Sequence, residues 1–265
     1  CALIIPAWIP EEIFSSKTAG SQINYWQPLG TLYVAASILK AEHDVRFLNG
    51  AFMSHSEILQ NVSDYKPDFV GLYSTTFGWK KAVQTASDIK RLTPPILPLN
   101  KGRSKEGLLN PFIAVGGPYP IAVQEKCLED SADIDAVVTG EGELTVVEML
   151  ERLSHGQSLA GVEGVIFRDA GRIVKNPPRH LITDLDSLPF PARELLGDAI
   201  NYIPPPATYK RKPVAVIITA RGCNRRCIFC FQIDKQRKLG VRYRSVENVM
   251  QEIELCLRQG YREIK

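Results

Sequence analysis

Three cysteines carry the clearest chemical signal in the sequence. Cys223, Cys227 and Cys230 are spaced C-x3-C-x2-C, and they follow an apolar run, Val214 to Ile218, that predicts a buried strand. A strand that leads directly into such a tight loop lets three thiolates converge on one metal site. Structural zinc is normally closed by four ligands, and a cubane iron–sulfur cluster is usually held by four thiolates. Three thiolates therefore predict a cluster with one iron open to a substrate or cofactor.

Two other interpretations of these cysteines stay open from the sequence. The loop could be a zinc knuckle, or its thiols could be free in a core. No fourth Cys or His stands at ligand spacing on either side, which favours the open cluster. Cys127 and Cys256 are predicted to be core residues; Cys256 shares the apolar face of a helix with Ile253.

The bulk composition is that of a globular chain. The 265 residues are 45% hydrophobic and 23% charged, and the net charge of +3 is too small to indicate nucleic acid or an anionic membrane as a partner. No apolar run approaches the roughly 18 residues that a bilayer span needs. Six cysteines with three clustered indicate a reducing compartment, the cytoplasm, and a metal site in place of disulfides.

The amino-terminal part alternates short apolar strands with helices. This pattern predicts an α/β fold with a doubly wound, Rossmann-like parallel sheet covered by helices on both faces. A helix is predicted to open at Pro28-Leu29-Gly30, and Ser54 or Ser56 could cap the next one. The expected strands are 2–5, 45–48, 69–73, 112–115 and 134–138.

Small and polar residues follow three of these strands. They are Ser74-Thr75-Thr76, Gly116-Gly117-Pro118 and Gly140-Glu141-Gly142-Glu143. In open α/β sheets this edge binds ligands, and backbone N–H groups at helix starts hold phosphate or amide oxygens. Each glycine taken alone is equally explained by a sharp strand-to-helix turn.

The pattern changes after Gly161. Two short runs flank Asp169-Ala170-Gly171 and predict a β-hairpin, and a Pro-rich interdomain linker runs from Asn176 to Pro213. A strand, the cysteine loop and a helix from Ser245 to Gln259 follow. We expect three regions: a ligand-binding domain over 1–155, a hairpin and linker over 156–212, and the start of a further domain over 213–265. The start at Cys1 and the strand-like end suggest a fragment.

The cysteine loop resembles that of the radical S-adenosylmethionine (radical SAM) enzymes, whose signature is C-x3-C-x-aromatic-C. Phe229 fills the aromatic place. The resemblance implies a [4Fe-4S] cluster on Cys223, Cys227 and Cys230, whose open iron chelates S-adenosylmethionine, with the backbone around Phe229 meeting the adenine. The reduced cluster then splits the sulfonium to a 5′-deoxyadenosyl radical. Arg221, Arg225 and Arg226 would stabilise the cluster's charge or the cofactor carboxylate, or are ordinary surface charges.

The order of motifs along the whole chain resembles the cobalamin-binding branch of this superfamily. The resemblance implies cobalamin in domain 1–155 and the first βα unit of a partial (β/α) radical SAM barrel in 213–265. The Asp-x-His-x-x-Gly motif that supplies a lower cobalt ligand in other cobalamin enzymes is absent, and Asn49-Gly50-Ala51 stands in its place. His55 is nearby. It is either a helix-cap or surface residue or a ligand of cobalt.

The loops after the strands are the expected cobalamin contacts. They comprise Ser74, Thr75, Thr76, Gly116, Gly117, Gly140, Glu141 and Gly142.

The resemblance implies an enzyme that methylates an unactivated carbon of a small-molecule substrate, with an electron donor such as flavodoxin or ferredoxin as partner. It also permits cyclisation or ring rearrangement. A cobalamin-binding or zinc-stabilised module without catalysis is the alternative from another class. The sequence identifies neither the substrate nor a catalytic residue.

Overall fold

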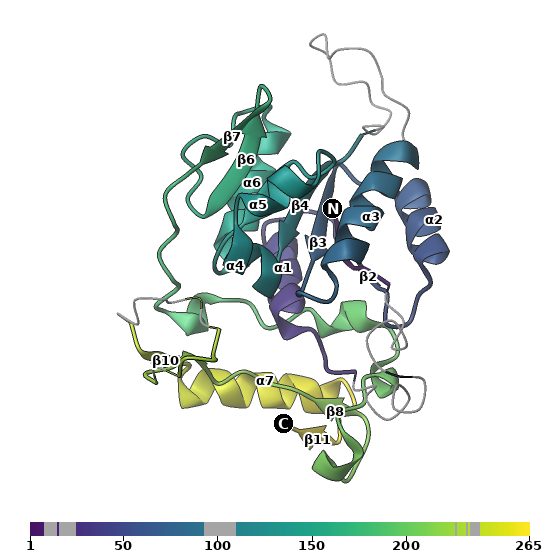
Figure 1. The fold of residues 1–265 in the computed structure, drawn as a ribbon. Coiled ribbons are helices and arrows are strands. Elements are labelled where there is room, and N and C mark those ends of the chain that lie inside the picture. The colour runs from purple at the N-terminus through teal and green to yellow at the C-terminus, as the bar shows by residue number, and fades with distance from the viewer. Residues whose placement is uncertain (8–14, 16–24, 93–109, 226, 232, 234–238) are drawn as a thin grey trace.

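The computed structural model of the chain describes residues 1–7, 15, 25–92, 110–225, 227–231, 233 and 239–265. A seven-stranded sheet flanked by helices forms the larger part, and a smaller unit containing the last helix lies below it in Figure 1. The α/β class expected from the sequence is confirmed. The strands of the large sheet are β1 (Ala2–Ile5), β2 (Arg46–Asn49), β3 (Phe69–Tyr73), β4 (Phe112–Gly116), β5 (Ala136–Val138), β6 (Val165–Asp169) and β7 (Arg172–Lys175).

The strand order of the sheet is β2-β1-β3-β4-β5-β6-β7. The first five of these strands are parallel, and β6 and β7 extend the sheet in antiparallel fashion. The order reverses between β1 and β3, which makes the gap between their carboxyl ends the topological switch point of the sheet. The predicted hairpin is therefore present as β6–β7, but it pairs with β5 and continues the large sheet.

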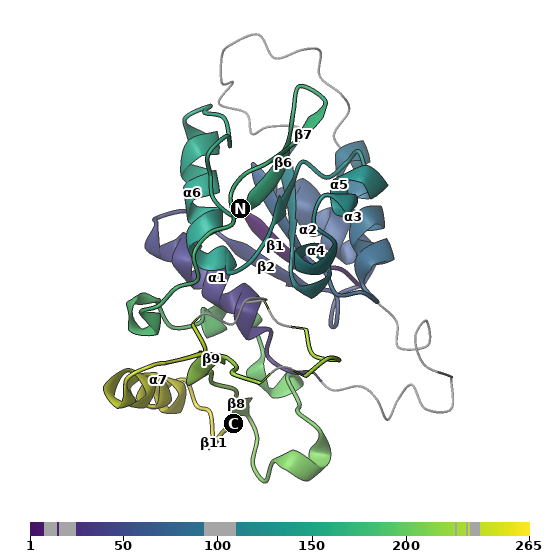
Figure 2. The ribbon, with the colours of Figure 1, turned by 60° about the vertical axis from the view of Figure 1, so that its left-hand side comes forward.

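Helices cover both faces of the sheet, as Figure 2 shows. On one face Ile58, Ile89 and Leu128 pack into the sheet, and on the other Ile38 and Met149 do so. The described part of the chain contains no helix with the length and apolar character that a bilayer crossing requires. The covering helices are α1 (Leu29–Lys40), α2 (His55–Tyr65), α3 (Trp79–Leu92), α4 (Pro118–Val123), α5 (Lys126–Asp130) and α6 (Gly142–Ser154).

Two helix starts follow the predicted chemistry. Pro28 is the N-cap of α1. Ser54 forms a capping box with Glu57 at the start of α2, so the first of the two candidate caps is the one used. The sequence between Thr93 and Pro111 predicts a Pro/Gly/Lys-rich insert, which falls mostly outside the described residues.

The Pro-rich linker packs on α1 and contains four single turns of 3₁₀ helix. Its Leu185 and Leu196 share a hydrophobic core with Leu32 and Tyr33 of α1. Partly buried Ile218 joins the same core, so the linker ties the sheet domain to the segment before the cysteine loop. The turns are η3 (Leu185–Ser187), η4 (Arg193–Leu196), η5 (Ala199–Asn201) and η6 (Pro206–Thr208).

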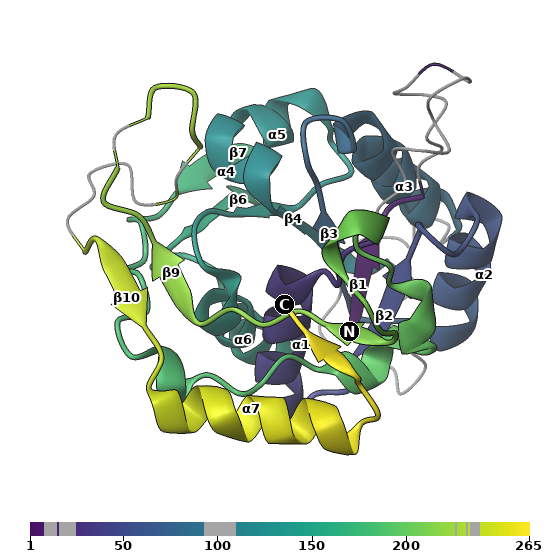
Figure 3. The same cartoon turned by 90° about the horizontal axis from the view of Figure 1, so that it is seen from below.

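The carboxy-terminal unit contains a parallel pair, β8 with β11, and an antiparallel pair, β9 with β10. Figure 3 shows β8 and β11 side by side, with α7 along the lower edge of the view. The strand predicted over 214–218 is shorter than expected because side chains take the backbone hydrogen bonds at its outer edge. Gln27 accepts a hydrogen bond from the Val216 N–H and donates one to the Val214 carbonyl. The elements are β8 (Val214–Ala215), β9 (Ala220–Gly222), β10 (Val241–Tyr243), α7 (Val246–Arg258) and β11 (Glu263–Ile264).

Candidate cofactor site

A cavity of about 1060 Å³ separates the carboxyl edge of the large sheet from the carboxy-terminal unit. Its wall contains Gly116, Gly117 and Gly140 from the ends of β4 and β5, and also Cys223 and Cys230. The ends of β1 and β3 line it as well, so the cavity occupies the switch point where open α/β sheets bind their ligands. The structure thus brings the predicted glycine loops and the predicted cysteine loop together at one cavity.

 

The glycines at this edge let the backbone approach the cavity closely. Gly117 has a φ of +102°, and a Cβ there would lie 2.8 Å from the Ser74 carbonyl oxygen. Gly140 has a φ of +105°, which L residues rarely adopt. Glu141 is the N-cap of α6 and makes no side-chain cap, so the start of this helix, where Gly142 and Glu143 line the cavity, has no capping side chain. Backbone N–H groups at a helix start bind phosphate or amide oxygens.

The hydroxyl loop after β3 is placed differently from the glycine loops. Ser74 is buried and donates to the Thr75 carbonyl, and the Thr75 hydroxyl accepts from the Gly78 N–H ahead of α3. Thr76 is exposed. None of the three is among the described residues that line the cavity. Their contact with a cofactor stays a prediction.

The loop after β2 offers no histidine to the cavity. Asn49 lines the cavity at this position, and its side-chain amide donates to the Tyr202 hydroxyl at 3.0 Å. His55 lies at the start of α2, where its Nε2 is 2.9 Å from Asp88 Oδ2 on α3. This contact with Asp88 therefore favours a structural role for His55 over ligation of cobalt.

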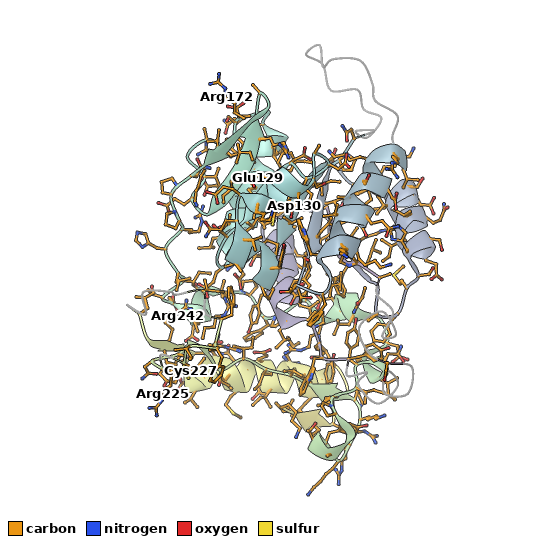
Figure 4. All side chains as sticks on the ribbon, in the orientation of Figure 1. Glu129, Asp130, Arg172, Arg225, Cys227 and Arg242 are labelled. Carbon is orange, nitrogen blue, oxygen red and sulfur yellow. The ribbon has the colours of Figure 1, made fainter. Side chains whose placement is uncertain are left out.

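The cysteine loop is closed at its base by two glycines. A Cβ on Gly222 would lie 2.1 Å from the Gly240 carbonyl oxygen, so only glycine fits where the loop leaves β9 and returns to β10. Cys227 and Cys230 are exposed and Cys223 is half-buried, and all three are free thiols. Within the described residues, no three His, Cys, Asp or Glu side chains are gathered in a metal-binding arrangement. Figure 4 shows Cys227 and Arg225 on the same side of the molecule as Arg242.

The chemistry of these donors fits an iron–sulfur cluster with one open position. Three thiols lie on one exposed loop. Among the described residues, their sulfurs have weak contacts, from the Arg225 N–H to Cys223 and from Cys230 to the Phe231 carbonyl. Phe229 is 89% exposed and does not line the cavity, so its predicted contact with adenine also stays a prediction. By contrast, Cys127 and Cys256 are buried core residues as predicted, and burial raises the pKa of Cys127 to about 12.

Arginines of the β9–β10 hairpin form ion pairs with the loop after β5. Arg221 contacts Glu141 at 3.1 Å and Glu143 at 2.6 Å, and Arg242 contacts Glu141 at 2.9 Å. Burial alone would raise the pKa of Glu141, but hydrogen bonds from Arg242, the Ile182 N–H and Arg221 lower it below its ordinary value. Arg221 is therefore neither a free surface charge nor directed at the cysteines. Arg225 is exposed, and Arg226 lies outside the described residues.

A second buried network fixes α7 beneath the hairpin. Glu252 of α7 is fully buried and binds both Arg193 of the linker and Arg244, which precedes the helix. Sequence reasoning missed this network and the role of Arg242, because Arg193 and Glu252 are 59 residues apart and Arg242 and Glu141 are 101 apart. A charged residue on the apolar face of the Ser245–Gln259 helix was the one signal that could have indicated it.

Comparison with known proteins assigns the chain to a family. The B12 binding domain family matches residues 19–150. An uncharacterized methyltransferase of Pyrococcus horikoshii is 33% identical over 245 residues, covering 90% of this chain and 48% of the relative. The chain superimposes on the cobalamin-dependent S-adenosylmethionine radical enzyme OxsB, solved with aqua-cobalamin and S-adenosylmethionine, with a TM-score of 0.75 at 20% identity. The chain belongs to the cobalamin-binding radical SAM family.

Another relative is named for a different activity. The anaerobic magnesium-protoporphyrin IX monomethyl ester cyclase of Synechocystis is 30% identical over 207 residues, covering 77% of this chain and 38% of the cyclase. The superposition on OxsB covers 98% of this chain and 32% of OxsB. The chain therefore spans about half or less of the length of the proteins that it matches. The family includes both methyltransferases and cyclases.

Proposed function

We propose that this chain is part of a cobalamin-dependent radical SAM enzyme that methylates an unactivated carbon of a small-molecule substrate. One observation carries the proposal. A single cavity has the glycine edge of a B12-binding domain on one side and Cys223 and Cys230 on the other. A cofactor held at the sheet edge and a cluster held by the loop would thus face the same cavity.

The chain's own residues would bind, orient and shield the reactive groups. Cys223, Cys227 and Cys230 would hold a [4Fe-4S] cluster, and the start of α6 at Gly142 and the backbone of Gly117 would hold cobalamin. When bound, these cofactors and S-adenosylmethionine supply the radical and the methyl group, and the protein supplies position and exclusion of water. Side chains such as Leu3, Phe69 and Val146 line the cavity and would exclude water from it.

The regional division follows from the same proposal. Residues 1–155 would form the cobalamin-binding domain, 156–212 the hairpin and linker, and 213–265 the opening of the radical SAM barrel. The parallel pairing of β8 with β11 around α7 supports a first βα unit of such a barrel. An electron donor such as flavodoxin or ferredoxin would reduce the cluster. All six cysteines are free, which supports a reducing compartment, the cytoplasm.

A second reaction is favoured by the similarity to the Synechocystis cyclase. In that case the substrate radical would close or rearrange a ring without receiving a methyl group. Product analysis with S-adenosylmethionine labelled in its methyl group separates the two reactions, since only methylation transfers the label to the product.

The test is anaerobic reconstitution of the protein with iron, sulfide and cobalamin. We expect about four irons per chain, consistent with one cubane cluster, the visible absorption of that cluster, and cobalamin that stays bound through gel filtration. A variant with Cys223, Cys227 and Cys230 all changed to Ala should lose the iron and keep the cobalamin. Zinc in place of iron, or iron that survives the triple substitution, would contradict the proposal and favour a non-catalytic module.

A further inference from the structure

The loop after β5 presents its backbone and its carboxylates to different partners. All four residues of Gly140-Glu141-Gly142-Glu143 line the cavity, and the carboxylates of Glu141 and Glu143 bind arginines of the β9–β10 hairpin. We propose that Glu141 and Glu143 are positioning residues, which set the cysteine loop against the cobalamin cavity. This inference rests on the proposed function for what occupies the cavity and the loop.

The hydrogen bonds of Glu141 leave its carboxylate little capacity for a cofactor. One oxygen accepts from Arg221 at 3.1 Å and from Arg242 at 3.0 Å. The other accepts from Arg242 at 2.9 Å and from the Ile182 N–H at 2.8 Å. A carboxylate offers about four acceptor sites, so these four bonds use them all. Glu141, predicted from the sequence as a cofactor contact, is thereby assigned to the protein's own hairpin through its side chain.

The two arginines need these carboxylates in order to stand side by side. Arg221 and Arg242 occupy directly opposite positions in the antiparallel β9–β10 pair. Like charges in that arrangement destabilise a strand pair. Glu141 contacts both arginines, Glu143 adds a second negative charge on Arg221, and the Arg221 guanidinium lies 4.9 Å from the centre of the Tyr33 ring on α1. The hairpin is thus fixed to the sheet domain by a charge-balanced cluster.

The same hairpin fixes the base of the cysteine loop. Arg221 stands two residues before Cys223, with only Gly222 between them, and Gly222 packs directly on Gly240 at the other end of the loop. The loop therefore has a base that the carboxylates hold in place, and its position relative to the glycine edge depends on them. Misplacing reacting groups by about 1 Å can cost on the order of 100-fold in rate.

The first experiment requires neither cofactor nor activity. Amide hydrogen exchange in the cofactor-free protein should be faster in Glu141→Gln than in the unaltered chain, and the increase should be concentrated in 220–222 and 241–243 and at Ile182, whose N–H bonds to Glu141. Glu151→Gln is the matched control, because Glu151 is an exposed residue of α6 at the other end of the helix. Unchanged exchange in Glu141→Gln would overturn the inference whether or not the proposed function holds.

The second experiment uses the whole enzyme of which this chain is proposed to be part, loaded with cluster and cobalamin. In Glu141→Gln we expect iron content and cobalamin retention near those of the unaltered protein, with at least a tenfold rise in 5′-deoxyadenosine formed per molecule of product. A merely structural role would lower both yields together and leave this ratio unchanged, which would overturn the inference. If Glu141→Gln does not fold, Glu143→Gln, which removes one contact to Arg221, decides by the same ratio. Absence of 5′-deoxyadenosine from the unaltered protein would instead refute the proposed function.

Discussion

Replacement of Glu252 by Gln tests the buried charge network that fixes α7. The Glu252 side chain is 0% exposed and binds two guanidinium groups, that of Arg193, which is 1% exposed, at 2.6 Å, and that of Arg244. Glutamine keeps the size of the side chain and removes its charge, which leaves two buried cations without a counter-ion. Removal of one partner from a buried ion pair costs about 3–5 kcal/mol. A domain's whole stability is only about 5–15 kcal/mol, so the loss should be large.

The same helix supplies a matched control. Glu254 is 64% exposed and lies 4.0 Å from Arg258 one turn later. An exposed pair of this kind contributes about 0.3–0.5 kcal/mol, so Glu254→Gln should change stability little. The free energy of unfolding is measured by equilibrium urea titration, followed by circular dichroism and tryptophan fluorescence together. Equal losses in Glu252→Gln and Glu254→Gln would refute the assignment of a buried, stabilising network.

Three further predictions concern the cysteine loop and its supports. Gly222→Ala should abolish cluster incorporation because its Cβ would lie 2.1 Å from the Gly240 oxygen. In Gly240→Ala the new Cβ would meet no described atom within 4 Å, and the φ of +63° costs only about 1–2 kcal/mol, so this variant should retain more of the iron; equal iron in the two would contradict the packing argument. In metal-free protein the three loop thiols should react with iodoacetamide at pH 8 while Cys127, buried and with a pKa of about 12, stays unmodified; fast alkylation of Cys127 in folded protein would count against the described core. The lowered pKa of Glu141 means that its contribution to stability is fully present above about pH 4.5 and is lost as the pH falls below that value. Urea titrations across this range should show a shallower pH dependence for Glu141→Gln, and parallel curves would contradict the prediction.

The elements of the sheet domain were predictable because their signals are local. The apolar runs at β1 and β3 and the capping box at Ser54 each depend on residues within one turn or strand. The glycines after β4 and β5 were found for the same reason, since chain order in βα units puts every strand end on one edge. Local signals could not show that β6–β7 would pair with β5, because the hairpin's neighbour is set by packing of the whole sheet.

The supports of the site were not predictable because their partners are far away in the sequence. Arg221 and Glu141 are 80 residues apart, and Gln27 and Val216 are 189 apart. From the sequence, Arg221 could be either a contact of the cluster or an ordinary surface charge. In the structure it is neither, because it forms ion pairs with Glu141 and Glu143. The strand predicted over 214–218 was too long for a related reason, since Gln27 and Arg193 take the hydrogen bonds that a neighbouring strand would have taken.

The proposed function requires cobalamin and an iron–sulfur cluster to share one cavity. Electron paramagnetic resonance can detect this in protein loaded with both and reduced so that cob(II)alamin and the cluster are each paramagnetic. We expect two signals that are split or broadened by dipolar coupling, and a single uncoupled cobalamin signal in the variant that lacks Cys223, Cys227 and Cys230. Two full-intensity signals with no mutual coupling in the unaltered protein would contradict it.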